Sequence, residues 1–194
     1  GFMFAPMHHS AMRHAIGPRK EMGLRTIFNI LGPMTNPAGV RRLLIGVYDA
    51  GLCRPVAEVL NRLGAEHVMV VHSEDGLDEI SAAASTHVVE VCDGSIKEYE
   101  LNPVGLGLEM TSLDGLEVDS ALESLDLIRS ALSGAPGDRA ARARNVVALN
   151  AGAALYVAGL QESVKDGVTE ASLLLQSGLP WARVEALADY TASL

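Results

Sequence analysis

The sequence predicts an α/β fold in which a mixed, mostly parallel sheet is flanked by helices. Two nearly continuous apolar runs, at 43–48 and 67–71, are typical of strands buried on both faces. Between them, residues 52–63 carry apolar side chains at helical spacing, and Gly64 is placed to end that helix. Strand, helix and strand in this order form a βαβ unit, which favours parallel strand pairing.

The second half of the chain predicts a hairpin followed by helices. Strands at 86–92 and 95–101 flank Asp93-Gly94, a strong signal for a tight hairpin turn. The expected helices then follow at Asp119–Leu132, Asp138–Leu160, Thr169–Ser177 and Pro180–Ala188, with Asp119, Asp138 and Thr169 as N-caps and Pro180 at a first helical position.

Composition limits the classes of function. The 194 residues are 48% hydrophobic and 20% charged, with a net charge of −9. No apolar run approaches the roughly 20 residues that span a bilayer, so we expect no membrane partner. Binding to a phosphate backbone requires clustered basic residues, so the acidic balance also argues against nucleic acid.

The cysteines and the first residues complete this general description. Cys53 and Cys92 are far apart and neither belongs to a C-x-x-C pair, so we expect free cytosolic thiols and no zinc site. The strand-like opening Phe2-Met3-Phe4, without an initiator Met, suggests that the sequence starts inside a domain.

The acidic segment Asp75-Gly76-Leu77-Asp78-Glu79 is the first candidate site. It follows the strand at 67–71, and ligands of open α/β sheets bind beyond the carboxyl ends of strands. Adjacent carboxylates suit a hard cation such as Mg²⁺. The alternative is an acidic loop in which Asp78 caps a following helix. The five residues alone leave both interpretations open.

The segment from His8 to Arg19 is the second candidate. Its histidines at 8, 9 and 14 have poor spacing for zinc and no interleaved cysteine or carboxylate. Arg19 is either a solvated charge at a helix end or a guanidinium fork for a carboxylate ligand. Further on, the Gly32-Pro33 loop either shapes a pocket wall or simply stops the helix expected at 26–31.

Two asparagines stand among apolar residues near the C-terminal end. A buried amide without a partner is costly, so we expect Asn145 and Asn150 to hydrogen-bond neighbouring loops. The pattern assigns neither of them a catalytic role.

These segments, in this order, resemble the anthranilate phosphoribosyltransferase family. The resemblance covers essentially the whole chain and lies in the following motifs: Phe4-Ala5-Pro6, His9-x-Ala11-Met12-Arg13-His14, Arg19-x-x-x-Gly23-x-Arg25-Thr26-x-Phe28-Asn29-x-Leu31-Gly32-Pro33-x-x-Asn36-Pro37, Val71-His72-x-x-Asp75-Gly76-Leu77-Asp78-Glu79-Ile80 and Leu149-Asn150-Ala151-Gly152-Ala153-Ala154-Leu155.

The resemblance implies a function in tryptophan biosynthesis. The family transfers the phosphoribosyl group of phosphoribosyl pyrophosphate (PRPP) to anthranilate with release of pyrophosphate. By resemblance, Arg19 binds the anthranilate carboxylate, and His9, Gly32 and Pro33 line the same pocket. The resemblance also implies that Asp78 and Glu79 would hold Mg²⁺. Residues 1–194 would then be the C-terminal portion of the large α/β catalytic domain, with a nucleoside phosphorylase/phosphoribosyltransferase-like fold, in a cytoplasmic homodimer.

Two departures from the family pattern matter. Ser10 stands where the family often has proline, which makes the helix entry less rigid. The family's Gly-Thr-Gly-Gly-Asp phosphate loop and Lys-His-Gly-Asn segment are not in these residues, and neither is its small helical N-terminal domain. In the family these segments precede the point where this sequence begins. We therefore expect residues 1–194 to form a half-site.

Two other functions are compatible with an α/β chain of this kind. A pyrimidine nucleoside phosphorylase is similar in fold but uses phosphate and a nucleoside; Arg19 together with Leu31-Gly32-Pro33 favours anthranilate. A non-catalytic paralogue that binds nucleic acid would need a basic groove, which a net charge of −9 disfavours.

Overall fold

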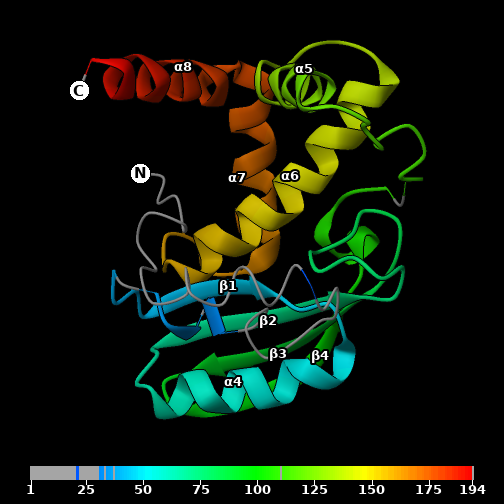
Figure 1. The fold of residues 1–194 in the computed structure, drawn as a ribbon. Helices are drawn as coiled ribbons and strands as arrows, with labels where there is room; N and C mark the ends of the chain where they lie inside the picture. Colours follow the sequence, from blue (N-terminus) through cyan, green and yellow to red (C-terminus); the bar gives the residue numbers. More distant parts are fainter. Residues whose placement is uncertain (1–20, 22–30, 33, 37, 110, 194) are drawn as a thin grey trace.

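The computed structural model describes residues 21, 31–32, 34–36, 38–109 and 111–193. A four-stranded sheet has helix α4 (Cys53–Arg62) on one face and helices α6 (Asp138–Val157) and α7 (Val164–Ser177) on the other (Figure 1). Helices α5 (Ala121–Leu132) and α8 (Leu179–Ala192) lie at the end of α6 and α7 that is distant from the sheet (Figure 1). The expected α/β class with a mixed sheet between helices is confirmed.

The strand order is β1-β2-β3-β4, with β1 at Arg42–Gly46, β2 at His67–Ser73, β3 at Thr86–Cys92 and β4 at Ser95–Leu101. Strands β1 and β2 are parallel, as the βαβ pattern predicts, whereas β2–β3 and β3–β4 are antiparallel. The expectation of a mostly parallel sheet is therefore wrong for the described residues. The reason is local, since the connections after β2 and at Asp93-Gly94 reverse the chain and contain no crossover helix.

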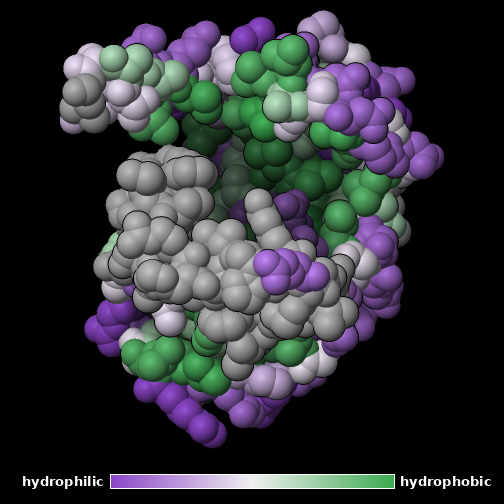
Figure 2. All heavy atoms as spheres, viewed as in Figure 1, coloured by the Kyte–Doolittle hydropathy of each residue, from purple (hydrophilic) through white to green (hydrophobic). Residues whose placement is uncertain are grey.

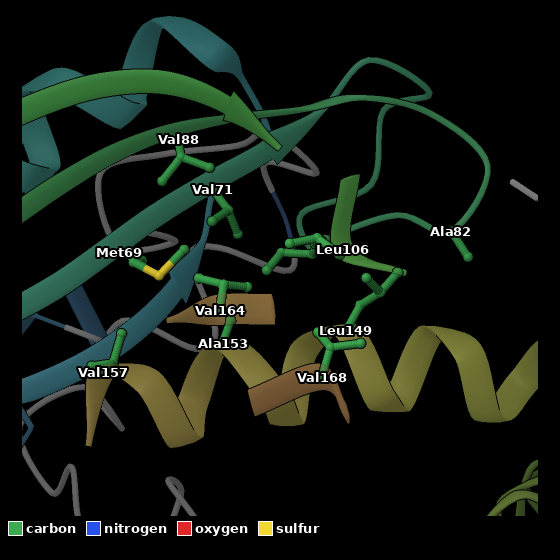
Figure 3. Packing of buried hydrophobic residues seen from close by; sticks show 11 residues of the cluster. Met69, Val71, Ala82, Val88, Leu106, Leu149, Ala153, Val157, Val164 and Val168 are labelled. Carbon is green, nitrogen blue, oxygen red and sulfur yellow. The ribbon is translucent and has the colours of Figure 1, made fainter. Parts of the chain in front are cut away.

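Strand β2 is buried on both faces, which explains its uninterrupted apolar sequence. Val68 and Val70 pack toward α4, while Met69 and Val71 pack toward α6 and α7. Figure 3 shows Met69, Val71 and Val88 pointing toward residues of α6 and α7 such as Leu149. These two apolar layers pack β2 from both sides up to its carboxyl end, where the candidate acidic loop begins.

Helices α6 and α7 cross at a pair of glycines. A Cβ added to Gly152 would lie 2.6 Å from Cα of Val168, and one added to Gly167 would lie 2.8 Å from the carbonyl carbon of Gly152. Atoms at such distances overlap, so no larger residue fits without moving the backbones apart. The crossing sets how α7 supports α6 against the sheet.

A buried carboxylate joins three elements at the other end of the sheet. Glu90 of β3 accepts hydrogen bonds from the hydroxyls of Tyr99 (2.9 Å) and Tyr156 (2.8 Å), and its Oε1 lies 2.7 Å from Nε2 of His67. Burial is the larger cause and the Glu90 carboxylate the second of a rise in the pKa of both tyrosines. The pKa of Tyr156 is raised to about 12, and that of Tyr99 is raised further. The network satisfies a carboxylate that would be costly to bury alone.

Several helix ends differ from the sequence-based expectation. Ser120 caps α5 and Ser163 caps α7, since each side-chain oxygen accepts a hydrogen bond from the backbone amide three residues on. Helix α6 follows Gly137 without a side-chain cap. The expected caps Asp119, Asp138 and Thr169 are therefore wrong, because several acceptors in each stretch suit a cap and sequence does not rank them.

Helical residues continue past the stop expected at Gly32. Leu31, Gly32 and Met34 are helical, and the amide of Thr35 donates to the carbonyls of Leu31 (3.0 Å) and Gly32 (3.2 Å). Gly32 lacks the positive φ with which glycine commonly ends a helix. The loop therefore begins after Met34.

Exposed large apolar side chains gather on α5, α7 and α8. The most exposed of them are Leu122 at 74%, Tyr190 at 63% and Leu179 at 60%. Figure 2 shows hydrophobic surface at this end of the molecule. Surfaces of this kind are typical of contact with further protein. No helix in the described part of the chain is long and apolar enough to cross a membrane.

Both cysteines are free thiols, as expected. Cys53 is fully buried against the sheet, and burial, with the charges of Glu98 and Asp49 adding to it, raises its pKa to about 11. A thiol with this pKa is protonated and unreactive at neutral pH, so Cys53 is a packing residue.

Candidate functional site

The acidic segment lies in the loop of residues 74–85, which leaves the carboxyl end of β2 beside the carboxyl end of its parallel neighbour β1. A tight turn opens the loop. The amide of Gly76 donates to the carbonyl of Ser73 (2.9 Å), and the amide of Ser73 donates to the carbonyl of Leu77 (2.9 Å). Gly76 has a φ of +91°. Glycine is favoured at this backbone conformation. The sequence-based location at a strand end is confirmed.

Asp75 serves the loop itself. One of its carboxylate oxygens accepts from the amide of Leu77 (3.3 Å), and the other accepts from the hydroxyl of Ser81. Ser81 is fully buried, and its hydroxyl oxygen accepts in turn from the amide of Ala83 (2.9 Å). The Asp75 side chain is thus committed to holding the loop closed and is separate from the two carboxylates that follow.

Asp78 and Glu79 are both exposed, and neither carboxylate has a hydrogen bond or ion pair with any residue that the structure describes. Residues 74–85 contain no helix. The alternative interpretation, in which Asp78 caps a helix, is therefore wrong. No described residue therefore occupies the two side chains, which suits contact with an external ligand.

The backbone of Asp78 lies directly against the end of β1. A Cβ added to Gly46 would lie 2.5 Å from the carbonyl carbon of Asp78 and would overlap its oxygen. Only glycine permits this approach. Gly46 therefore allows the acidic loop to settle across the carboxyl end of β1, a function that its place in an apolar run does not reveal.

The loop is fixed again immediately after Glu79. The side chain of Ile80 is 1% exposed in the core between the sheet and α6. Its amide donates to Oδ1 of Asn150 on α6 (2.9 Å), and its carbonyl accepts from Nδ2 of the same side chain (2.9 Å). The expected tie from Asn150 to a neighbouring loop is confirmed, whereas Asn145 makes no hydrogen bond with its side chain in the described part of the chain.

The donor set suits a hard cation completed by other ligands. Asp78 and Glu79 offer oxygen ligands, and among the described residues no group of three or more His, Cys, Asp or Glu side chains could hold a metal ion. Mg²⁺ is commonly bound through one or two carboxylates, with water and substrate phosphates supplying the remaining oxygens. The pair fits that pattern and does not fit a closed, all-protein cage.

The other predicted site residues are mostly beyond the described part. His9, Arg19 and Pro33 lie outside the described residues. Gly32 is described, and no described atom lies within 4 Å of the position that a Cβ would take there. Its predicted role in a pocket wall stays a prediction.

The family model "Glycosyl transferase family, a/b domain" matches residues 1–180. The chain belongs to this family. It is 59% identical to the anthranilate phosphoribosyltransferase of Saccharophagus degradans over 192 residues, which are 99% of this chain and 56% of that protein. The chain therefore spans little more than half the length of such a relative.

Solved structures of this family show the same fold. The anthranilate phosphoribosyltransferase of Thermus thermophilus superposes with a TM-score of 0.84 at 41% identity, covering 96% of this chain and 54% of that one. The Saccharomyces cerevisiae enzyme in complex with PRPP and Mg gives a TM-score of 0.82 at 26% identity, covering 96% of this chain and 53% of that one. The resemblance stated from the motifs is confirmed at the level of family and fold.

Proposed function

We propose that the longer protein to which this chain corresponds transfers the phosphoribosyl group of PRPP to anthranilate and releases pyrophosphate. The observation that carries the proposal is the Asp78–Glu79 carboxylate pair at the carboxyl edge of β2, exposed and unpaired among the described residues, in a chain whose relatives bear this activity in their names. Residues 1–194 would supply the C-terminal portion of the large α/β domain.

The reaction is a substitution at the anomeric carbon of ribose. The bond between C1 and a pyrophosphate oxygen breaks, the bond between C1 and the anthranilate nitrogen forms, and the nitrogen loses a proton to solvent. The aromatic amine is neutral at pH 7, so no strong base is needed to prepare it. Positioning of the amine close to C1 then supplies much of the rate.

Asp78 and Glu79 would hold Mg²⁺, which when bound neutralises the charge that gathers on the leaving pyrophosphate. The exposure of both carboxylates supports this role, because bulky phosphates need an open approach. Asp75 supports it indirectly by keeping the turn closed with bonds to Leu77 and Ser81. The S. cerevisiae relative named above was solved with PRPP and Mg.

Arg19 would bind the anthranilate carboxylate, with His9, Gly32 and Pro33 lining the pocket. A guanidinium presents a planar pair of donors that matches a carboxylate, and such charge-assisted contacts select orientation as well as affinity. This assignment rests on the motifs alone. The resemblance likewise supports a cytoplasmic location and a homodimer. Light scattering of the purified full-length protein would test the homodimer.

The test is a direct comparison of substrates. Full-length protein with Mg²⁺ and PRPP is expected to consume anthranilate, which is measured as a loss of anthranilate fluorescence. The same sample with thymidine and inorganic phosphate is expected to release no thymine. Phosphorolysis of thymidine without consumption of anthranilate would instead identify a pyrimidine nucleoside phosphorylase and overturn the proposal. Salt-sensitive binding of DNA without turnover of either substrate would favour the nucleic-acid-binding alternative.

Residues 1–194 alone provide a further control. They contain no glycine-rich loop that opens a helix and could cradle phosphates, and Gly105-x-Gly107 leads into no helix start. We expect no measurable turnover from these residues, and restored turnover when a polypeptide supplying the missing half is added. Robust turnover by a sample whose intact mass corresponds only to residues 1–194 would refute the half-site expectation.

A further inference from the structure

We propose that Asn150, on helix α6, is a positioning residue for the carboxylates of Asp78 and Glu79. The inference deepens the proposed function, on which its catalytic part rests. Asn150 touches neither carboxylate; it holds the backbone of the residue that follows them.

The side chain of Asn150 uses its whole donor capacity at this place. One hydrogen-bond pair is reciprocal, since Oδ1 accepts from the amide of Ile80 and Nδ2 donates to the carbonyl of Ile80, both at 2.9 Å. Nδ2 also donates to the carbonyl of Val146 one helical turn earlier, at 2.9 Å. A primary amide has two N–H donors, and both are occupied. The bond to Val146 orients the side chain toward the loop.

The reciprocal pair matters because the stretch Asp78–Glu79, which follows the turn closed by Asp75, has few other restraints. It lies in no helix or strand, and the carboxylates of Asp78 and Glu79 make no bond within the described residues. The restraints lie on either side: the Asp78 backbone rests against Gly46, and the Ile80 backbone is held by Asn150. Carboxylates that bind a metal through such a short segment depend on these supports for their placement.

Burial of the Ile80 side chain offers a simpler account, in which Asn150 only satisfies two backbone groups. Ile80 is 1% exposed and would anchor the loop by packing alone. The two accounts differ in what loss of the amide does. Packing tolerates rotation of the peptide planes next to Ile80, and such rotation swings the carboxylates of the preceding residues. Only the positioning account therefore predicts a change in metal response at unchanged fold.

The experiment uses three variants of the full-length protein. Asn150→Ala removes the hydrogen bonds of the side chain to Ile80 and Val146. Asn150→Asp keeps the size of the side chain and one acceptor, but replaces the donor that faces the carbonyls of Ile80 and Val146. Asn145→Ala is the matched control, since Asn145 lies on the same helix and makes no side-chain hydrogen bond among the described residues.

Two measurements are made on each variant. Amide hydrogen exchange is measured for the peptides covering 75–82 and for those covering α6. This measurement does not require the protein to be active. The Mg²⁺ concentration for half-maximal turnover, at saturating PRPP and anthranilate, reports on the metal. Removing a residue that supports a metal ligand typically costs roughly 10-fold or more in metal affinity. We expect a shift of about that size, with faster exchange confined to 75–82, for both Asn150 variants and not for Asn145→Ala.

Unchanged exchange at 75–82 in both Asn150 variants would overturn the proposal. So would exchange that rises equally throughout α6, since that indicates general loosening of the helix. Local exchange with an unchanged Mg²⁺ requirement would also overturn it, because the loop would then be held without any effect on the metal. If the wild-type protein turns over no anthranilate, the proposed function fails by that result. The positioning role of Asn150 is then tested by amide hydrogen exchange at 75–82 and by Mn²⁺ binding in the presence of pyrophosphate.

Discussion

Substitution of Gly46 by alanine is the sharpest test of how the acidic loop is built. The change adds one methyl group at the end of β1, where the structure leaves no room for it. The added carbon would lie 2.5 Å from the carbonyl carbon of Asp78. Carbon atoms in contact are normally about 3.5 Å apart or more. The carbonyl oxygen of Asp78 would overlap the added carbon outright, so the Asp78 backbone must retreat by more than about 1 Å.

The size of the effect follows from this displacement. Overpacking of this kind typically costs about 1–3 kcal/mol of stability. A misplacement of catalytic groups by about 1 Å is typically worth on the order of 10²-fold in rate. The retreat moves Asp78 and Glu79 together, so we expect Gly46→Ala to fold with a lower melting temperature, to need more Mg²⁺ and to lose about 100-fold or more in kcat/KM.

The assay combines thermal melts with steady-state kinetics over a Mg²⁺ titration in the full-length protein. Gly105→Ala is a matched control, because Gly105 has no positive φ and no described atom within 4 Å of its added Cβ. It is expected to behave as wild type. A Gly46→Ala protein with wild-type kcat/KM and an unchanged Mg²⁺ requirement would show that the close approach does not place the carboxylates.

Three further outcomes are expected. Arg19→Ala should raise the anthranilate KM by about 10-fold or more, since a charge-assisted contact is worth about 1.5–3 kcal/mol, and leave the KM for PRPP unchanged; an unchanged anthranilate KM would remove Arg19 from the site. Asp78→Asn combined with Glu79→Gln should lower kcat and move the Mg²⁺ optimum upward with little change in melting temperature, whereas Glu74→Gln in the same loop should do neither. A normal Mg²⁺ profile in the double variant would exclude the metal role. Tyr156→Phe removes one donor from the buried carboxylate on β3 and should cost about 1–2 kcal/mol of unfolding free energy at pH 7. The raised pKa of Tyr156 also means that its contribution is complete below pH 10 and is lost as the pH rises toward 12; chemical denaturation across this range should show a smaller alkaline loss in the variant, and an equal loss would place the titrating group elsewhere.

Local periodicity was sufficient for most of the secondary structure. Strands β3 and β4 have the predicted bounds, and Asp93 and Gly94 both have the positive φ values that their hairpin signal implies. These features are predictable because the deciding interactions lie within a few residues of one another. The helix caps were less predictable, since Ser120 and Ser163 compete with neighbouring acceptors and the choice depends on how each helix packs.

The candidate site divides in the same way. The motif with Asp78 and Glu79, and its place after a strand, were readable from the sequence. The supports of that motif were not. Gly46 appears only as one residue in an apolar run, and Asn150 stands 70 residues from the backbone groups that it binds.

The physical reason is the range of the interactions involved. A strand, a helix or a turn is encoded by neighbours along the chain, so the sequence by itself determined the α/β class, the position of the acidic loop and the resemblance to a family. Contact between Gly46 and Asp78, or between Asn150 and Ile80, exists only after the sheet and α6 have packed together. The tertiary structure alone established which residues hold the two carboxylates in place.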